Sequence, residues 1–127
     1  MGTRALVKVY DEGNDVVSCI YSQWDGYPSG LGVDLAAFLN SIKLVNGYTG
    51  KEMGPVANGM GCLAGQLVVH LKKQVGSYYM VSPNQDHGEE YTYDIYQNKV
   101  RVSNHDKEVL YLGPWDGFSE FCNGSDD

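Results

Sequence analysis

Residues 4–22, RALVKVYDEGNDVVSCIYS, decide the fold class because they predict a β-hairpin at the start of the chain. Arg4 to Tyr10 holds enough β-branched and apolar residues for one strand, and Val16 to Ser22 predicts a second. The segment between them, DEGN at 11–14, has the residues of a turn. A hairpin here favours a fold in which neighbouring strands of the sheet run antiparallel.

Two helices are expected in the middle of the chain. Glycine and proline interrupt residues 23–32 too often for regular structure, but residues 33–42 then carry apolar side chains with the spacing of one helical face. A second helix is predicted from Cys62 to about Gln74. Residues 46–61, between the two, hold five glycines and a proline and predict a long loop. Long loops inside compact domains are often functional.

The last third of the chain predicts four more strands and a terminal helix. The strands are expected at 77–81, 91–96, 100–102 and 108–112, and the helix at 114–121. Within 91–96 the side chains alternate, with Tyr91, Tyr93 and Ile95 on one face and Thr92, Asp94 and Tyr96 on the other. The order ββααββββα predicts one α+β domain over residues 1–127, with a mostly antiparallel sheet and two or three helices on one face.

Composition limits the partners and the compartment. The chain has 127 residues and a net charge of −7, so a nucleic-acid polymer is not expected as a partner, because its phosphates would be repelled. Three widely spaced cysteines without a CxxC pair argue against a disulfide framework or a zinc ribbon and favour a reducing, cytoplasmic setting. The N-terminus has no long apolar run, so neither a signal peptide nor a membrane contact is expected. No metal or cofactor is expected either.

The aromatic turn QWDGYP at 23–28 is the first of three stretches that could carry a function. Trp24 and Tyr27 could stack on a base or a sugar, while Gln23 and Asp25 could supply directional hydrogen bonds. A rigid corner whose aromatic rings pack on the core explains the same residues and is slightly favoured.

The glycine-rich stretch NGMGC at 58–62 is the second, because it stands at the start of the second helix. Free amides at a helix N-terminus attract anions, and Gly59 and Gly61 would expose such amides. Lys51 could add a counter-charge, although Gly50-Lys51 is followed by Glu52 and is not a Walker motif. Cys62 has no base within reach on its own helix, so a buried structural role is favoured for it. An ordinary junction between loop and helix is an equal alternative for the stretch.

The acidic stretch GEEY at 88–91 is the third. Glu89, Glu90 and Asp94 could perform acid–base chemistry or hold a metal ion. Adjacent strand residues point to opposite faces, so Glu89 and Glu90 would not act as a pair, whereas Glu90 and Asp94 would share a face. A solvated start of a strand is the favoured interpretation, and the three histidines show no metal-ligand spacing.

Four motifs in this order resemble those of a family of small uncharacterised proteins of bacteria and their phages. They are the MGTR start, the turn QWDGYPSG with Gly32, the helix start NGMGCLA, and GEEY followed by Tyr93. The resemblance covers residues 1 to about 96 and implies a bacterial or phage setting. It supplies no mechanism and no catalytic residues. The phage setting suggests, by analogy, a sponge-like protein that sequesters a host nucleotide signal.

The three stretches together suggest one binding site for a small polar or anionic molecule, such as a nucleotide. A ring would stack on Trp24 or Tyr27, and a homo-oligomer is compatible with such a site. One alternative is a small hydrolase using Asp25, Glu90 or Cys62, and another is a protein-binding module with exposed tyrosines. The candidate ligand-binding residues are Arg4, Gln23, Trp24, Asp25, Tyr27, Lys51, Gly59, Gly61, Cys62 and Glu90.

Overall fold

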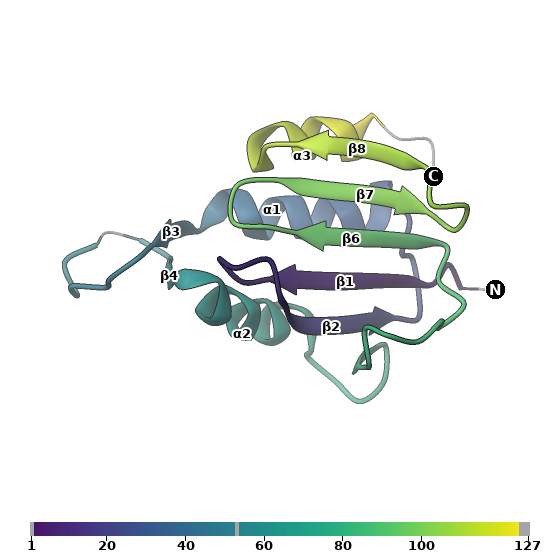
Figure 1. Cartoon of the computed structure of the whole chain (residues 1–127), viewed down its shortest axis with the longest axis horizontal. Helices are drawn as coiled ribbons and strands as arrows, with labels where there is room; N and C mark the ends of the chain where they lie inside the picture. The colour runs from purple at the N-terminus through teal and green to yellow at the C-terminus, as the bar shows by residue number, and fades with distance from the viewer. Residues whose placement is uncertain (1, 53, 125–127) are drawn as a thin grey trace.

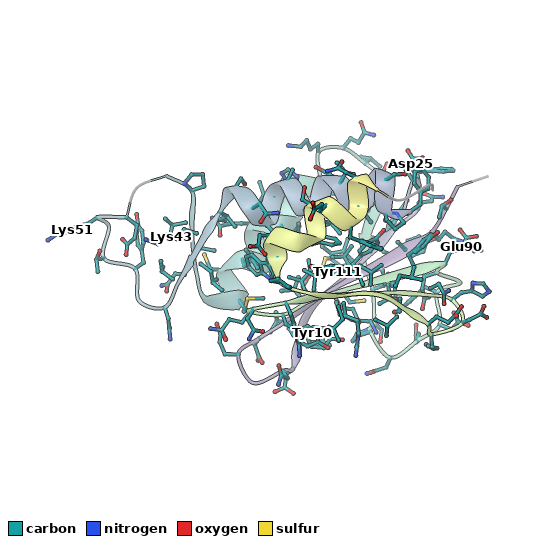
Figure 2. All side chains as sticks on the ribbon, turned by 90° about the horizontal axis from the view of Figure 1, so that it is seen from above. Tyr10, Asp25, Lys43, Lys51, Glu90 and Tyr111 are labelled. Atoms are coloured by element: carbon teal, nitrogen blue, oxygen red, sulfur yellow. The ribbon has the colours of Figure 1, made fainter. Side chains whose placement is uncertain are left out.

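The computed structural model describes residues 2–52 and 54–124, and its main feature is a six-stranded sheet with helices on one face (Figures 1 and 2). The strands lie in the order β5-β2-β1-β6-β7-β8. Their bounds are β1 (Ala5–Tyr10), β2 (Val16–Ser22), β5 (Tyr78–Met80), β6 (Tyr91–Ile95), β7 (Val100–Asn104) and β8 (Val109–Gly113). The helices are the short π-helix η1 (Pro28–Gly32), α1 (Val33–Ser41), α2 (Gly59–Leu71) and α3 (Trp115–Asn123). The predicted α+β class is therefore confirmed, whereas the prediction that residues 23–32 hold no regular structure was wrong for 28–32.

The sheet is mixed, because its two central strands run parallel. β1 pairs with β6 in parallel, which sets Val7 beside Tyr93 and Lys8 beside Asp94. The other four pairs are antiparallel, including the predicted hairpin of β1 and β2. A parallel pair joins strands far apart in the sequence, so no local pattern announces it.

The segment predicted as a long loop contains regular structure at its end. β3 (Lys43–Val45) and β4 (Val56–Asn58) form a second, two-stranded parallel sheet, and α2 begins at Gly59 rather than at Cys62. The prediction of a loop over residues 46–61 was therefore wrong for its last part. Strands of three residues are too short to show a period of two, which explains the error. The connection between β3 and β4 projects from the body of the molecule (Figure 1).

The hydrophobic core lies between the six-stranded sheet and the helices. Val7 and Val9 of β1 are fully buried in it, as are Tyr93 and Ile95 of β6. The Tyr93 hydroxyl donates a hydrogen bond of 2.6 Å to the Gly26 carbonyl, and burial raises the pKa of this hydroxyl above its ordinary value. The predicted alternation in 91–96 is thus confirmed. The alternate residues point to the other face of the sheet, which none of the described helices covers (Figure 1).

Candidate functional site

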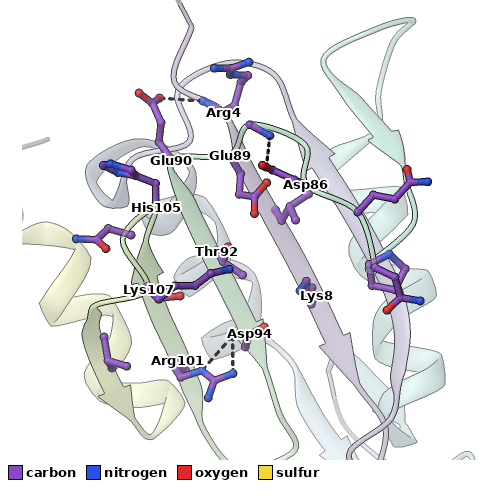
Figure 3. Close-up of a pocket in the computed structure, with 18 of the residues that line it drawn as sticks. Arg4, Lys8, Asp86, Glu89, Glu90, Thr92, Asp94, Arg101, His105 and Lys107 are labelled. Atoms are coloured by element: carbon purple, nitrogen blue, oxygen red, sulfur yellow. Dashed lines mark hydrogen bonds and ion pairs between the residues drawn. The ribbon is translucent and has the colours of Figure 1, made fainter.

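The uncovered face of the sheet is hollowed into a groove of about 950 Å³, which we call the sheet-face groove (Figure 3). The loop between β5 and β6 forms one wall, and the turn between β7 and β8 forms the other. The floor consists of Leu6 and Lys8 of β1, Thr92 and Asp94 of β6, and Arg101 and Ser103 of β7. The volume is at the upper end of the range of about 300–1,000 Å³ that small-molecule sites occupy.

A hydrogen-bonded network closes one end of this groove. Asp94 is only 3% exposed, and its carboxylate accepts hydrogen bonds from the Tyr10 hydroxyl at 2.9 Å and from Arg101 Nε at 3.1 Å. The Arg101 guanidinium also forms an ion pair with Asp94 at 3.0 Å. The Tyr10 ring stacks on Tyr96, with 4.3 Å between ring centroids. Burial, together with the Asp94 charge, raises the pKa of the Tyr10 hydroxyl above its ordinary value, so this hydroxyl stays a donor. The buried charge is therefore compensated within the network.

The other carboxylates that line the groove are engaged by backbone amides of the chain. Each of the three accepts one such hydrogen bond. The pairs are Asp86 with the Gly88 amide at 2.9 Å, Glu89 with the His87 amide at 3.1 Å, and Glu90 with the Arg4 amide at 3.3 Å. These contacts give each carboxylate a hydrogen-bond donor from the chain and hold it in place.

Apart from Arg101, the cationic side chains of the groove are less engaged than its carboxylates. Within residues 2–52 and 54–124, the ion pairs include neither Arg4 nor Lys8 nor Lys107. Lys8 rises from the floor, and Lys107 reaches across β7 toward Thr92 (Figure 3). Ammonium groups without a carboxylate partner attract anions, so the groove has positive charge available for a ligand.

A second hollow, the end cavity, continues from the groove around the end of the sheet. Its volume is about 790 Å³, and it shares Glu90, Asn104 and His105 with the sheet-face groove. Tyr27 lines the end cavity and not the sheet-face groove. Its hydroxyl donates a hydrogen bond of 3.2 Å to Asp25 Oδ1, which raises the pKa of Tyr27.

Two of the three candidate stretches lie at this end of the sheet. The Gly26 amide donates to the Thr3 carbonyl at 2.9 Å, and the Glu90 amide donates to the Arg4 carbonyl at 2.8 Å. Both stretches are thus held by the segment that leads into β1. Tyr27 and Glu90 line the same cavity, as the hypothesis of a shared site requires.

Other residues of the aromatic turn face a different hollow. Trp24, 50% exposed, and Asp25 line a smaller cavity of about 420 Å³ together with Tyr78. The backbone amide of Gln23 donates a hydrogen bond of 2.9 Å to the Ser77 carbonyl. Gln23 lines none of these three cavities. The turn is therefore a firmly held corner, and of its aromatic residues only Tyr27 reaches the end cavity.

The third stretch lies at the opposite end of the sheet. The Met60 amide at the start of α2 donates a hydrogen bond of 2.9 Å to Glu12, which belongs to the turn after β1. A carboxylate of the chain thus already takes the place predicted for an anionic ligand between Gly59 and Gly61. Lys51 lies on the projecting connection, far from Glu90 (Figure 2). The hypothesis of one site built from all three stretches is corrected accordingly.

The residues predicted for a hydrolase are dispersed, and two predictions about side-chain burial were wrong. Cys62 is exposed rather than buried and donates to Gln66 at 3.4 Å, while Asp25 and Glu90 line different cavities. Asp94 is buried in the network rather than solvated. All three cysteines are free, and within the described ranges no group of three or more His, Cys, Asp or Glu residues could hold a metal ion.

Lys8, Arg101 and Lys107 were not expected in a site from the sequence, although one indication was present. The turn at 97–99 closes a hairpin in which Asp94 lies opposite Arg101, on the uncovered face. Opposite charges directly across two antiparallel strands stabilise the pairing. Counting back from the predicted turn would have given this pair, whereas the approach of Lys107 depends on the tertiary structure.

The fold and the groove define an α+β protein with a polar cleft on the open face of its sheet. No family model matches the chain, and no curated protein or solved structure matches it. The resemblance to the family of bacteria and phages therefore stays a prediction. In the part of the chain that the structure describes, no helix combines the length and the apolar character needed to cross a membrane.

Proposed function

We propose that this protein binds a small anionic molecule in the sheet-face groove. One observation carries the proposal: the carboxylates of the groove have partners from the chain, whereas Lys8 and Lys107 have no ion pair among the described residues. A ligand with a phosphate or carboxylate group supplies the missing partner.

Two hydroxyl groups support the same place for the anion. Thr92 and Ser103 lie directly opposite each other on β6 and β7, and both line the groove. Directly opposed residues of antiparallel strands have Cβ atoms about 5 Å apart. The two hydroxyls thus add a pair of donors between Lys8 and Lys107. A tetrahedral oxyanion can use donors that approach it from several directions, so phosphate fits this arrangement best.

The backbone at Lys107 also supports a binding role. Lys107 has a φ of 69°, a left-handed conformation that is costly for a residue with a side chain. Its amide donates to the Asn104 carbonyl at 3.0 Å, and the Asn104 side chain accepts from the Glu108 amide at 3.0 Å. These bonds hold the turn in the form that carries Lys107 toward the groove.

We further propose that binding occurs without turnover. Asp25, Glu90 and Cys62 do not share one site, and the buried Asp94 already accepts two hydrogen bonds and forms an ion pair with Arg101. Among functions that need binding without turnover, the phage resemblance favours sequestration of a nucleotide-derived signal. It requires tight binding and no catalytic pair.

Calorimetric titration with inorganic phosphate tests the proposal. The variant with both Lys8→Met and Lys107→Met is expected to bind at least about tenfold more weakly, since each charge-assisted hydrogen bond is worth about 1.5–3 kcal/mol. The double variant Lys43→Met/Lys51→Met is the matched control, because it also removes two positive charges, at the far end of the molecule (Figure 2). Equal phosphate affinity in all three proteins contradicts the proposal.

A second candidate, association through the edge strand β8, rests on a separate observation. Val109, Leu110 and Leu112 are 55%, 41% and 58% exposed, and no strand formed by the described residues pairs with the outer side of β8. Open edges with apolar side chains accept another strand, including that of a second copy. Light scattering after chromatography would show a dimer that Leu112→Lys disrupts, whereas a monomer at all concentrations excludes this candidate.

A further inference from the structure

We propose that the ligand occupies both the sheet-face groove and the end cavity and is a ribonucleoside phosphate. The inference rests on the proposed function, because it takes the anion in the groove as given. The two hollows meet at Glu90, Asn104 and His105, so one molecule can extend from one into the other. Their volumes of about 950 and 790 Å³ leave room for a ligand larger than phosphate alone.

The order of the chemical groups along this path identifies the class of ligand. Lys8 and Lys107 line only the groove, Glu90 lines both hollows, and Tyr27 lines only the end cavity. The path therefore leads from a groove that holds these cations together with Asp86, Glu89 and Asp94, past Glu90, to the Tyr27 ring. A nucleotide has the complementary order: an anionic phosphate, a ribose with hydroxyl donors, and a flat base.

Glu90 fixes the direction in which such a ligand lies. One of its carboxylate oxygens, Oε2, accepts the Arg4 amide, and no hydrogen bond among the described residues uses the other. An ionised carboxylate only accepts hydrogen bonds, so its second oxygen suits ribose hydroxyls. With the ribose at Glu90, the phosphate can extend into the groove that Lys8 and Lys107 line.

Tyr27 is held in place before any ligand arrives. Its hydroxyl bonds to Asp25, and its ring lies so close to Gly30 that a Cβ there would approach it to 2.9 Å. The Leu31 amide donates to the Asp25 carbonyl at 2.9 Å and so secures the turn. A ring fixed in this way loses little conformational entropy when a base stacks on it.

Calorimetry with inorganic phosphate, adenosine and adenosine monophosphate tests this inference. The monophosphate is expected to bind at least about tenfold more tightly than either fragment, because stacking adds about 1–3 kcal/mol per base. Tyr27→Ala should reduce its affinity to that of phosphate and leave phosphate binding unchanged. Tyr27→Phe should keep the stacking, and Trp24→Ala should have no effect, because Trp24 lines another cavity.

The outcomes separate the two proposals. Two results would refute a ligand that spans both hollows and would leave the anion site in place. One is that the monophosphate binds no more tightly than phosphate, and the other is that Tyr27→Ala leaves the affinity for the monophosphate unchanged. If neither phosphate nor the monophosphate binds, the proposed function fails together with the inference. A 2′,3′-dideoxy monophosphate should bind about tenfold more weakly than the ribonucleotide; equal affinity removes the role given to Glu90.

Discussion

Removal of the Arg101 guanidinium should destabilise the protein through Asp94. In the Arg101→Met variant, the Asp94 carboxylate keeps the hydrogen bond from the Tyr10 hydroxyl at 2.9 Å. It loses the hydrogen bond from Arg101 Nε at 3.1 Å and the ion pair at 3.0 Å, although it is only 3% exposed. Breaking a buried ion pair costs about 3–5 kcal/mol. The Arg101 side chain is 41% exposed, so water would reach the site and reduce the loss. We expect a decrease of about 2 kcal/mol in the free energy of unfolding.

Urea unfolding followed by circular dichroism measures this loss. With a slope of about 1–3 kcal/mol/M, the midpoint should fall by about 1 M at an unchanged slope. The double variant Asp94→Asn/Arg101→Met should lose less than the sum of the single variants, by about 1–2 kcal/mol, because it leaves no unpaired charge. Losses that add to within about 0.5 kcal/mol would refute the coupling.

Lys99→Met is the control for this experiment. Its ammonium lies 5.0 Å from the centroid of the Tyr96 ring on the same part of the sheet, but it has no carboxylate partner among the described residues. An exposed cation–π contact contributes about 0.5–1 kcal/mol. A loss as large as that of Arg101→Met would mean that any cation in this region has the same effect.

Three further predictions concern the rest of the chain. Gly26→Ala should lower the free energy of unfolding by about 1–3 kcal/mol, because the new Cβ would lie 2.6 Å from the Cβ of Ala5. Gly65→Ala should instead raise it by about 0.5–1 kcal/mol, because the new Cβ would meet open space and alanine favours the helix α2. Thermal unfolding ranks the two, and the opposite order contradicts the packing. Burial raises the pKa of the Cys122 thiol to about 12, so the unfolded chain releases this proton first and stability should fall as the pH rises from about 9 to 12. Cys122→Ala should show a shallower decline in the same urea assay, and an equal decline would exclude this thiol as a cause. In the folded protein Ellman's reagent should modify only the exposed Cys62, with one thiol reacting, and release of three would contradict the burial of the other two.

Local patterns predicted the elements whose period is visible in the sequence. The alternation at 91–96 correctly separated Tyr93 and Ile95, which are buried in the core, from Thr92 and Asp94 on the other face. The helix expected at 33–42 is observed as α1, since its apolar spacing covers more than two turns. The short strands β3 and β4 were missed because three residues carry no recognisable period.

The candidate site was less predictable because strands from distant parts of the chain form its floor. Lys8 becomes part of the groove only through the parallel pairing of β1 with β6, which sets it beside Asp94. The aromatic turn and the acidic stretch lie at the same end of the sheet, but no pattern in the sequence distinguishes them from the glycines at the start of α2, which lie at the other end. Glu12, which takes the Met60 amide, is 48 residues away in the chain.

The measurement that tests the binding site most directly is a titration of the ¹⁵N-labelled protein with phosphate, followed by two-dimensional NMR. If the sheet-face groove holds the anion, the largest amide shifts should fall on β1, β6 and β7 around Lys8, Thr92 and Ser103, and around Lys107 in the following turn. Shifts concentrated at the start of α2, around Gly59 and Gly61, or the absence of any saturable shift, would contradict the account.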